Sequence, residues 1–257
     1  MKNNPNYITK LAAIPRLGAG ERQQLEPVVD KFSFRVNDYY VNLIDWDDPN
    51  DPIRRIIIPS AQELENWGRL DASDETNYMV APSVEHKYEY TALILVNNVC
   101  GSYCRFCFRK RIFMNENDEV TRDISGGLEY IRQHKELTNI LLTGGDPLIL
   151  STGKLKNIIR QLREMEHVNI IRIGSKIPAF NPFRIVNDPT LPEMLAKYSL
   201  PDKRIYLMAH FNHPRELTKE AIEAMDILHR AGVISCNQTA LLKGINDNPD
   251  VLAELMK

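Results

Sequence analysis

The feature that most constrains this chain is a run of three cysteines within eight residues, Cys100, Cys104 and Cys107, in the stretch CGSYCRFCFRKR. It directly follows the apolar residues 92–96. Thiolates separated by three and then two residues can converge on one metal centre, and an iron–sulfur cluster is the usual reason for such a run. Three ligands leave a coordination position open to substrate, as in catalytic zinc sites. The alternatives are a structural zinc site without its fourth ligand, or coincidence.

The bulk composition excludes several other classes of protein. A net charge of −2 over 257 residues gives no electrostatic case for binding nucleic acid or an anionic membrane. No apolar run approaches the roughly 20 residues that span a bilayer, and the first residues lack the apolar core of a signal peptide. Clustered cysteines are also unlike a disulfide scaffold. We therefore expect a cytoplasmic protein with no nucleic-acid partner and no membrane partner.

The chain divides near residue 90 into two expected regions. Residues 1–90 are predicted to be a mostly helical extension, with short helices at 21–31, where Pro27 would kink or split the helix, and at 38–43. A further helix is predicted at 61–70, capped by Ser60 with Glu63 at the capping-box position. The proline-containing residues 47–52 predict a turn, and residues 71–83 predict a connecting loop.

From residue 90 onward, short apolar runs alternate with helical patterns. The predicted strands cover residues 90–97, 139–143, 169–173, 204–209 and 233–237. The predicted helices cover residues 123–135, 154–165, 191–198, 219–231 and 249–256. Five strand–helix units in succession predict an α/β fold, a closed or partial (β/α) barrel of parallel strands, over residues 91–257.

The unusual polar residues fall at the carboxyl ends of the predicted strands, where the chemistry of such folds collects. They are Cys100, the stretch Gly144-Gly145-Asp146-Pro147, Gly174-Ser175-Lys176, His210 with His213, and Asn237-Gln238. The two glycines let the backbone approach a ligand closely, and Asp146 could accept a hydrogen bond from a ligand ammonium. Alone, the GGDP stretch could also be an ordinary turn.

Taken together, the cysteine run and the GGDP stretch resemble the radical S-adenosylmethionine (SAM) superfamily. Cys100, Cys104 and Cys107 match its cluster motif, and Phe106 fills the aromatic position before the third cysteine. Gly144, Gly145, Asp146 and Pro147 match the stretch that holds the SAM ammonium. The resemblance implies a [4Fe–4S] cluster, SAM, and an electron donor such as flavodoxin or ferredoxin. It also implies cleavage of SAM to a 5′-deoxyadenosyl radical that takes hydrogen from the substrate.

Within that superfamily, the chain resembles the lysine 2,3-aminomutase family over about 200 residues. The matching segments, in order, are DPNDPIRR at 48–55, RIGSK at 172–176, HFNHP at 210–214, and residues 237–247. The resemblance implies an isomerase that moves an amino group from C2 to C3 of a lysine-like amino acid, in a homo-oligomer. It also implies SAM contacts for Ser175, Asn237 and Gln238.

The resemblance further assigns substrate contacts. Arg109 matches the arginine that holds the substrate α-carboxylate, a task suited to a bidentate guanidinium, and Asp247 matches one of two aspartates that hold the lysine side-chain ammonium. Arg109 could instead be an exposed helix arginine, and Asp247 a turn or N-cap residue. His210 and His213 could line the pocket or be satisfied core histidines. Cys236 is expected to be a small buried hydrophobe.

The resemblance breaks at pyridoxal phosphate (PLP), which the family's aminomutases hold on a lysine in a Gly-rich segment toward the C-terminus. This sequence contains no such segment. Lys87 and Tyr88 are compatible with binding the PLP phosphate, but Thr91 stands where an arginine is typical. We therefore expect either a truncated aminomutase, or one with a partner at the open sheet edge. The alternatives are a short radical SAM enzyme without PLP and with another substrate, or a catalytically incomplete cluster-binding protein.

Overall fold

The computed structural model describes residues 4–66, 68–114 and 117–257. Within them, a seven-stranded sheet joins its strands in chain order. The strands are β3 (Met79–Ala81), β4 (Val84–Tyr88), β5 (Thr91–Asn97), β6 (Asn139–Gly144), β7 (Ile170–Ser175), β8 (Ile205–Ala209) and β9 (Ile234–Asn237). β3, β4 and β5 pair antiparallel, and β5 to β9 pair parallel. The predicted α/β fold with a partial barrel is confirmed.

Five longer helices return the chain from each parallel strand, as the sequence predicted. They are α4 (Ser125–Gln133), α5 (Thr152–Arg163), α8 (Thr190–Tyr198), α9 (Lys219–Arg230) and α10 (Pro249–Leu255). Their apolar faces pack on one face of the sheet, where Ile94, Ile140 and Ile171 are fully buried in the main core. The short helices α6 (Ile177–Phe180) and α7 (Phe183–Val186) were not predicted, because Pro178 and Pro182 interrupt the helical pattern.

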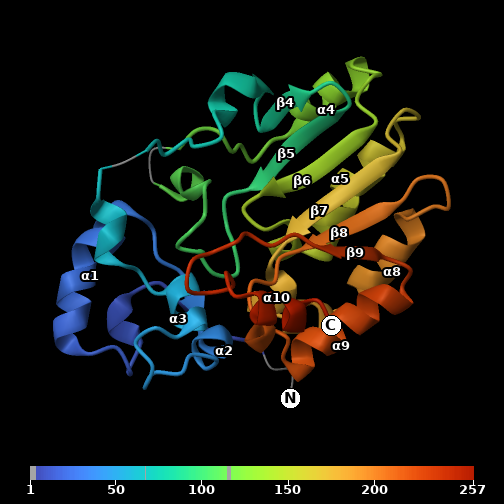
Figure 1. The fold of residues 1–257 in the computed structure, drawn as a ribbon. Coiled ribbons are helices and arrows are strands. Elements are labelled where there is room, and N and C mark those ends of the chain that lie inside the picture. Colours follow the sequence, from blue (N-terminus) through green and yellow to red (C-terminus); the bar gives the residue numbers. More distant parts are fainter. Residues whose placement is uncertain (1–3, 67, 115–116) are drawn as a thin grey trace.

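A second core lies in the N-terminal region, at the end of the sheet toward which the arrowheads of β5, β6 and β7 point (Figure 1). Its elements are the ribbon of β1 (Tyr7–Ile8) and β2 (Val36–Asn37) with α1 (Ala19–Lys31), α2 (Asp38–Val41) and α3 (Pro52–Ile57). Ile14, Tyr40 and Ile53 are fully buried there, and Cys104 and Phe106 pack against them. The N-terminal region therefore covers the cysteine loop.

Several N-terminal expectations were wrong. α1 continues through Pro27, and the helix expected at 61–70 is only a 3₁₀ turn, η2 (Ala61–Leu64), although its Ser60–Glu63 capping box is present. Pro52 starts α3 instead of blocking a helix, because proline at the first position needs no hydrogen-bond partner and Asp51 caps the end. The sheet also begins before residue 91, since β3 and β4 lie in the expected extension.

Across the part of the chain that the structure describes, no helix has the length and apolar character needed to cross a bilayer.

Candidate active site

The three cysteines lie on the loop that leaves the carboxyl end of β5, and all three thiols are free. The N-terminal region fixes this loop through its backbone: Tyr103 N donates to Arg35 O at 2.8 Å, and Arg105 N donates to Ile56 O at 2.8 Å. Arg35 also donates from Nε to Cys100 O at 3.0 Å. The positions of the thiols are therefore set by tertiary contacts and not by the loop alone.

Burial raises the pKa of the Cys104 thiol to about 12, with Lys176 as an opposing positive charge, and raises that of Cys100 well above its usual range. Without a metal these groups are thiols at neutral pH, and metal binding would release their protons. In the described residues, no three His, Cys, Asp or Glu side chains gather tightly enough for a single metal ion. A polynuclear iron–sulfur cluster takes each thiolate on a different iron, so its three thiolates need not converge on a single ion.

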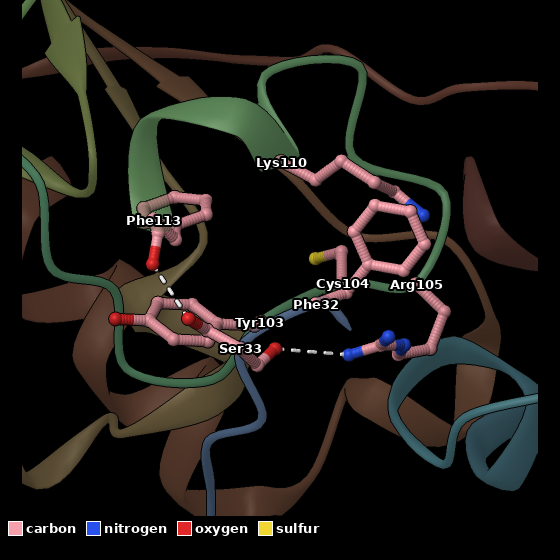
Figure 2. Close-up of a pocket in the computed structure, with 7 residues that line it drawn as sticks. All are labelled: Phe32, Ser33, Tyr103, Cys104, Arg105, Lys110 and Phe113. Atoms are coloured by element: carbon pink, nitrogen blue, oxygen red, sulfur yellow. Dashed lines mark hydrogen bonds between the residues drawn. The ribbon is translucent and has the colours of Figure 1, made fainter. Parts of the chain in front are cut away.

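Figure 2 shows the outer side of the same loop, where Cys104 lies among Phe32, Tyr103 and Phe113. The cavity they line has a volume of about 10 Å³, which is close to one water molecule. Arg105 and Lys110 lie at this side and both pair with Glu63, at 2.7 and 3.0 Å. A cavity of this size cannot admit a substrate.

The Gly144-Gly145 stretch is joined to the start of the cysteine loop. Gly144 has φ +104°, and Gly145 N donates to Asn97 O at 2.6 Å. A Cβ on Gly145 would come within 2.4 Å of both backbone N and O of Val99, so no larger residue fits. This close approach fixes the two segments predicted to bind cluster and SAM against each other.

The Asp146 carboxylate, predicted to accept from a ligand ammonium, accepts from four donors of the protein itself in this structure. Its two oxygens accept hydrogen bonds from Leu148 N, Ser175 Oγ, Lys176 N and Ile177 N, at 2.7 to 3.1 Å. Burial raises its pKa to about 6, while these four donors act to lower it. Because its acceptor positions are filled, Asp146 holds the end of β6 to the end of β7.

A second buried network stands beside Cys104. Lys176 Nζ donates to His210 O at 3.0 Å and Asn212 Oδ1 at 2.7 Å, and pairs with Glu216 at 2.6 Å. Glu216, fully buried, also accepts from the hydroxyl of Tyr40 in the N-terminal region. The network thus fixes the ends of β7 and β8 to the N-terminal core and places a positive charge near the cysteines.

The two histidines behave differently. Burial, with Lys176 nearby, lowers the pKa of His210 to about 3, so its ring is neutral. Its Nε2 is buried without a hydrogen-bond partner, and its ring centre lies 5.8 Å from that of Phe106. An unpaired ring nitrogen beside the cysteine loop favours the pocket-lining alternative. His213 instead caps η6 (Pro214–Glu216) by accepting from Arg215 N at 3.2 Å.

Arg109 is buried, which excludes the exposed-helix alternative. Its Nε lies 3.0 Å from both carboxylate oxygens of Glu75, its Nη2 donates to Glu75 at 2.6 Å, and its Nη1 donates to Thr143 Oγ1 at 2.9 Å. A guanidinium has five N–H groups, so one remains on each terminal nitrogen. Arg109 therefore keeps two N–H groups for a carboxylate, in an orientation set by Glu75 and Thr143.

The remaining predicted residues do not converge on the cysteines through any contact in the described structure. Asn237 exchanges hydrogen bonds with the backbone of Phe211, at 2.9 and 3.3 Å, and Gln238 N donates to Ala209 O at 2.7 Å. Asp247 is exposed and accepts from Gly244 N, which is the turn role. Tyr88 is 62% exposed, Lys87 donates to Ser73 O, and Cys236 is exposed, contrary to expectation.

The residues at the carboxyl ends of β5 to β7 fit the expected cofactors. One loop carries three free thiols, and the Gly145 backbone beside it has no room for a side chain. Ser102 Oγ and His210 Nε2 are buried there without a hydrogen-bond partner. The model of the Radical SAM superfamily matches residues 94–256. A protein of Aquifex aeolicus (strain VF5) named "Putative L-lysine 2,3-aminomutase" is 57% identical over 98% of this chain and 67% of its own length. The chain belongs to the lysine 2,3-aminomutase family of the radical SAM superfamily.

This family is one of enzymes of the aminomutase type, and its members differ in substrate. The L-lysine 2,3-aminomutase of Clostridium subterminale is 37% identical over 100% of this chain and 61% of its own length. The glutamate 2,3-aminomutase of Clostridioides difficile (strain 630) is 35% identical over 98% of this chain and 59% of its own length. Near-equal identity to proteins named for lysine and for glutamate means that overall similarity does not select the substrate.

Sequence reasoning gave no individual role to three charged residues of the described structure, Lys176, Glu75 and Glu85. Lys176 directly follows Ser175 at a strand end, and that position was a usable signal. Glu75 and Glu85 had no signal, because the first lies in a polar stretch interpreted as a loop and the second in a segment interpreted as part of the extension. The hydrogen-bond partners of the Glu75 and Lys176 side chains are more than 20 residues away, as with Arg109 and Glu75.

Glu85 is expected to lower stability in a pH-dependent way. Burial, with Glu75 nearby, raises its pKa from 4.5 to about 7. A carboxyl whose folded-state pKa is raised costs stability above its unfolded pKa, and the cost is complete above pH 7. The free energy of unfolding of Glu85→Gln, relative to that of the native chain, is expected to rise by about 2 kcal/mol between pH 5 and pH 8. Urea unfolding at both pH values measures this, and an equal effect at each would contradict it.

Proposed function

We propose that this chain holds a [4Fe–4S] cluster on Cys100, Cys104 and Cys107 and uses it with SAM to move an amino group between C2 and C3 of an amino acid. When bound together, cluster and SAM supply a 5′-deoxyadenosyl radical, which takes a hydrogen atom from the substrate. The observation that carries the proposal is the close packing of the Gly144-Gly145 backbone on the start of a loop with three free thiols. An external donor such as flavodoxin or ferredoxin would supply the electron.

The chain's own residues would position the reactants. The backbone carbonyls of residues 144–147 would take the SAM ammonium, while Asp146 and Ser175 keep that backbone in place. His210 and Phe106 would line the SAM side of the pocket, with Asn237 and Gln238 at the end of β9 as further SAM contacts. Arg109 would hold the substrate α-carboxylate with its two remaining N–H groups.

The pocket also offers a means to exclude water. The N-terminal core covers the outer side of the cysteine loop, where the cavity next to Cys104 is of about the size of one water molecule. Exclusion of water protects a radical from quenching by solvent and strengthens the electrostatic contacts around it. PLP stays a prediction from the family resemblance; in this structure Lys87 donates to Ser73 O and Tyr88 is largely exposed. Asp247 as an ammonium ligand likewise stays a prediction.

The proposal is tested by anaerobic reconstitution of the cluster, followed by reductant, SAM and either L-lysine or L-glutamate, with and without PLP. We expect 5′-deoxyadenosine together with β-lysine or β-glutamate, identified by mass spectrometry. 5′-Deoxyadenosine without any β-amino acid would indicate a radical SAM enzyme with another substrate. The absence of both products would indicate a cluster-binding protein without this activity.

Arg109→Lys is expected to raise the KM for the amino-acid substrate about tenfold or more. Lysine keeps the positive charge but loses the fork that binds Glu75, Thr143 and a carboxylate together. Steady-state kinetics with the substrate identified above measures the change. Arg105→Lys is the matched control, since Arg105 pairs with Glu63 on the outer side of the same loop. An equal rise in KM for both variants would remove the substrate role of Arg109.

A further inference from the structure

Lys176 is a buried cation that the proposed function does not use. It follows the last residue of β7, and only 6% of it is exposed. Its ammonium donates to His210 O and Asn212 Oδ1 and pairs with the fully buried Glu216. A buried ion pair adds little to stability, because the loss of hydration offsets its attraction. The presence of this pair therefore calls for another explanation.

Lys176 is packed against the loop that carries the cysteines. Gly101 lies between the first two cysteines, and a Cβ on it would come within 3.0 Å of Ile177 Cδ1 and 3.2 Å of Phe180 Cβ. Ile177 is the residue after Lys176, and the Lys176 ammonium lies over the Phe180 ring, 5.1 Å from its centre. Phe180 belongs to the core against which Cys104 packs. The cysteine loop and the lysine therefore share one packed contact.

The charges that act on Cys104 come from several elements. Lys176 opposes the rise in the pKa of the Cys104 thiol, whereas Glu216, Asp146 and the Cys107 thiol add to it. The effect of Lys176 is larger than that of either carboxylate. Both carboxylates are buried and accept hydrogen bonds from the backbone of the chain itself. Lys176 is therefore the strongest single charge that acts on this thiol.

The ammonium is also held in place. Glu216 accepts from the hydroxyl of Tyr40 in the N-terminal core and from the backbone N–H groups of Asn212 and His213. The backbone N–H of Lys176 donates to the Asp146 carboxylate at 2.7 Å. A charge fixed at both its backbone and its ammonium keeps its position when a charge appears nearby. Lys176 is thus a fixed positive charge beside the proposed cluster loop.

Reduction of a cluster on these thiols takes one electron from an external donor, which is oxidised, and takes up no proton. The cluster side of the loop therefore gains one negative charge. A buried cation stabilises such a charge more than an exposed one does, because the protein interior screens it less. Net charge and solvent exposure are among the factors that set the potential of iron–sulfur clusters. We propose that Lys176 raises the reduction potential of the cluster and so favours the electron transfer that precedes SAM cleavage.

This inference rests on the proposed cluster, and it is tested by potentiometric titration of the reconstituted protein without SAM. The readout is the electron paramagnetic resonance signal of the reduced cluster. At a fixed potential, we expect Lys176→Met to lower the ratio of reduced to oxidised cluster about tenfold, a shift of about 59 mV for a one-electron couple. Glu216→Gln removes the carboxylate that partly cancels the ammonium, so it should raise that ratio.

Two further variants separate charge from packing. Lys176→Arg keeps the positive charge and should stay within about twofold of the native ratio. Lys197→Met removes a lysine charge from the exposed side of α8 and should leave the ratio native. Shifts of opposite sign in Lys176→Met and Glu216→Gln indicate an electrostatic effect. A merely structural role would move both potentials in one direction, or neither.

The outcomes separate this inference from the proposed function. If Lys176→Met binds less iron than the native chain, Glu216→Gln and Lys176→Arg decide: a raised ratio in the first and a native ratio in the second support the inference. A native or lowered ratio in Glu216→Gln overturns it. Native potentials in all variants leave the cluster standing and remove the role of Lys176. If the reconstituted native chain gives no iron–sulfur signal, the cluster and this inference both fail.

Discussion

Replacing Cys104 with alanine is expected to abolish formation of 5′-deoxyadenosine and to lower the iron and sulfide content of the reconstituted protein. A [4Fe–4S] cluster held by three thiolates cannot keep both its protein anchorage and its open iron when one thiolate is lost. Cys104 is also the thiol that packs against the N-terminal core and lies near Lys176. The effect should therefore be complete rather than graded, and Cys100→Ala and Cys107→Ala should behave alike.

Cys236→Ala is the matched control. Cys236 is also a free cysteine, but it is exposed on β9 and lies outside the loop. Iron analysis and the electron paramagnetic resonance spectrum of the reduced protein should be native in this variant. A Cys104→Ala protein that retains native iron content and cleaves SAM at the native rate would overturn the assignment of the cluster.

Asp146→Asn is expected to destabilise the protein by about 2–4 kcal/mol and to reduce SAM cleavage at least tenfold. An amide has only one acceptor oxygen, so about two of the four donors now bound by the carboxylate would lose their partner. Those donors belong to the end of β7 and to the start of η5 (Pro147–Ile149), next to the Gly144-Gly145 backbone. The loss should therefore displace the backbone proposed to bind the SAM ammonium.

Thermal unfolding and the KM for SAM measure the two parts of this effect. Asp188→Asn provides the control, because Asp188 also accepts several hydrogen bonds, from Thr152, Thr190 and Arg184, but at α7 and α8. It should lose stability without a change in the KM for SAM. If Asp146→Asn loses stability and retains its native KM for SAM, the SAM-binding role of this backbone would be wrong.

The N-terminal region shows where local patterns were insufficient. Isolated motifs such as the Ser60–Glu63 capping box formed as predicted, yet the helix that it should start is a single 3₁₀ turn. The Pro52 helix was missed because the same residue can end one helix or begin another. Such ambiguities are resolved by packing: Ile53, Ile56 and Ile57 are fully buried against the rest of the N-terminal core.

The sheet shows the opposite case. All five predicted parallel strands are present within two residues of their predicted ends, from β5 (Thr91–Asn97) to β9 (Ile234–Asn237). Strands that are buried on both faces are short apolar runs separated by polar turns. The alternation of apolar and polar segments can be recognised directly in the sequence. Their shared direction then brings their carboxyl ends together, which is why Cys100 and the Gly144-Gly145 stretch meet.

The sequence by itself therefore determined the fold class, the five parallel strands and the motifs at their carboxyl ends, because apolar periodicity and cysteine spacing are local properties. Only the tertiary structure decided what each charged side chain does there. In the described residues, the acceptor positions of Asp146 are filled, Arg109 is bound to Glu75 across 34 residues, and Oε1 of Glu85 has no hydrogen-bond partner. These roles depend on which distant groups share a buried space, where every polar atom needs a partner, and no local pattern records that.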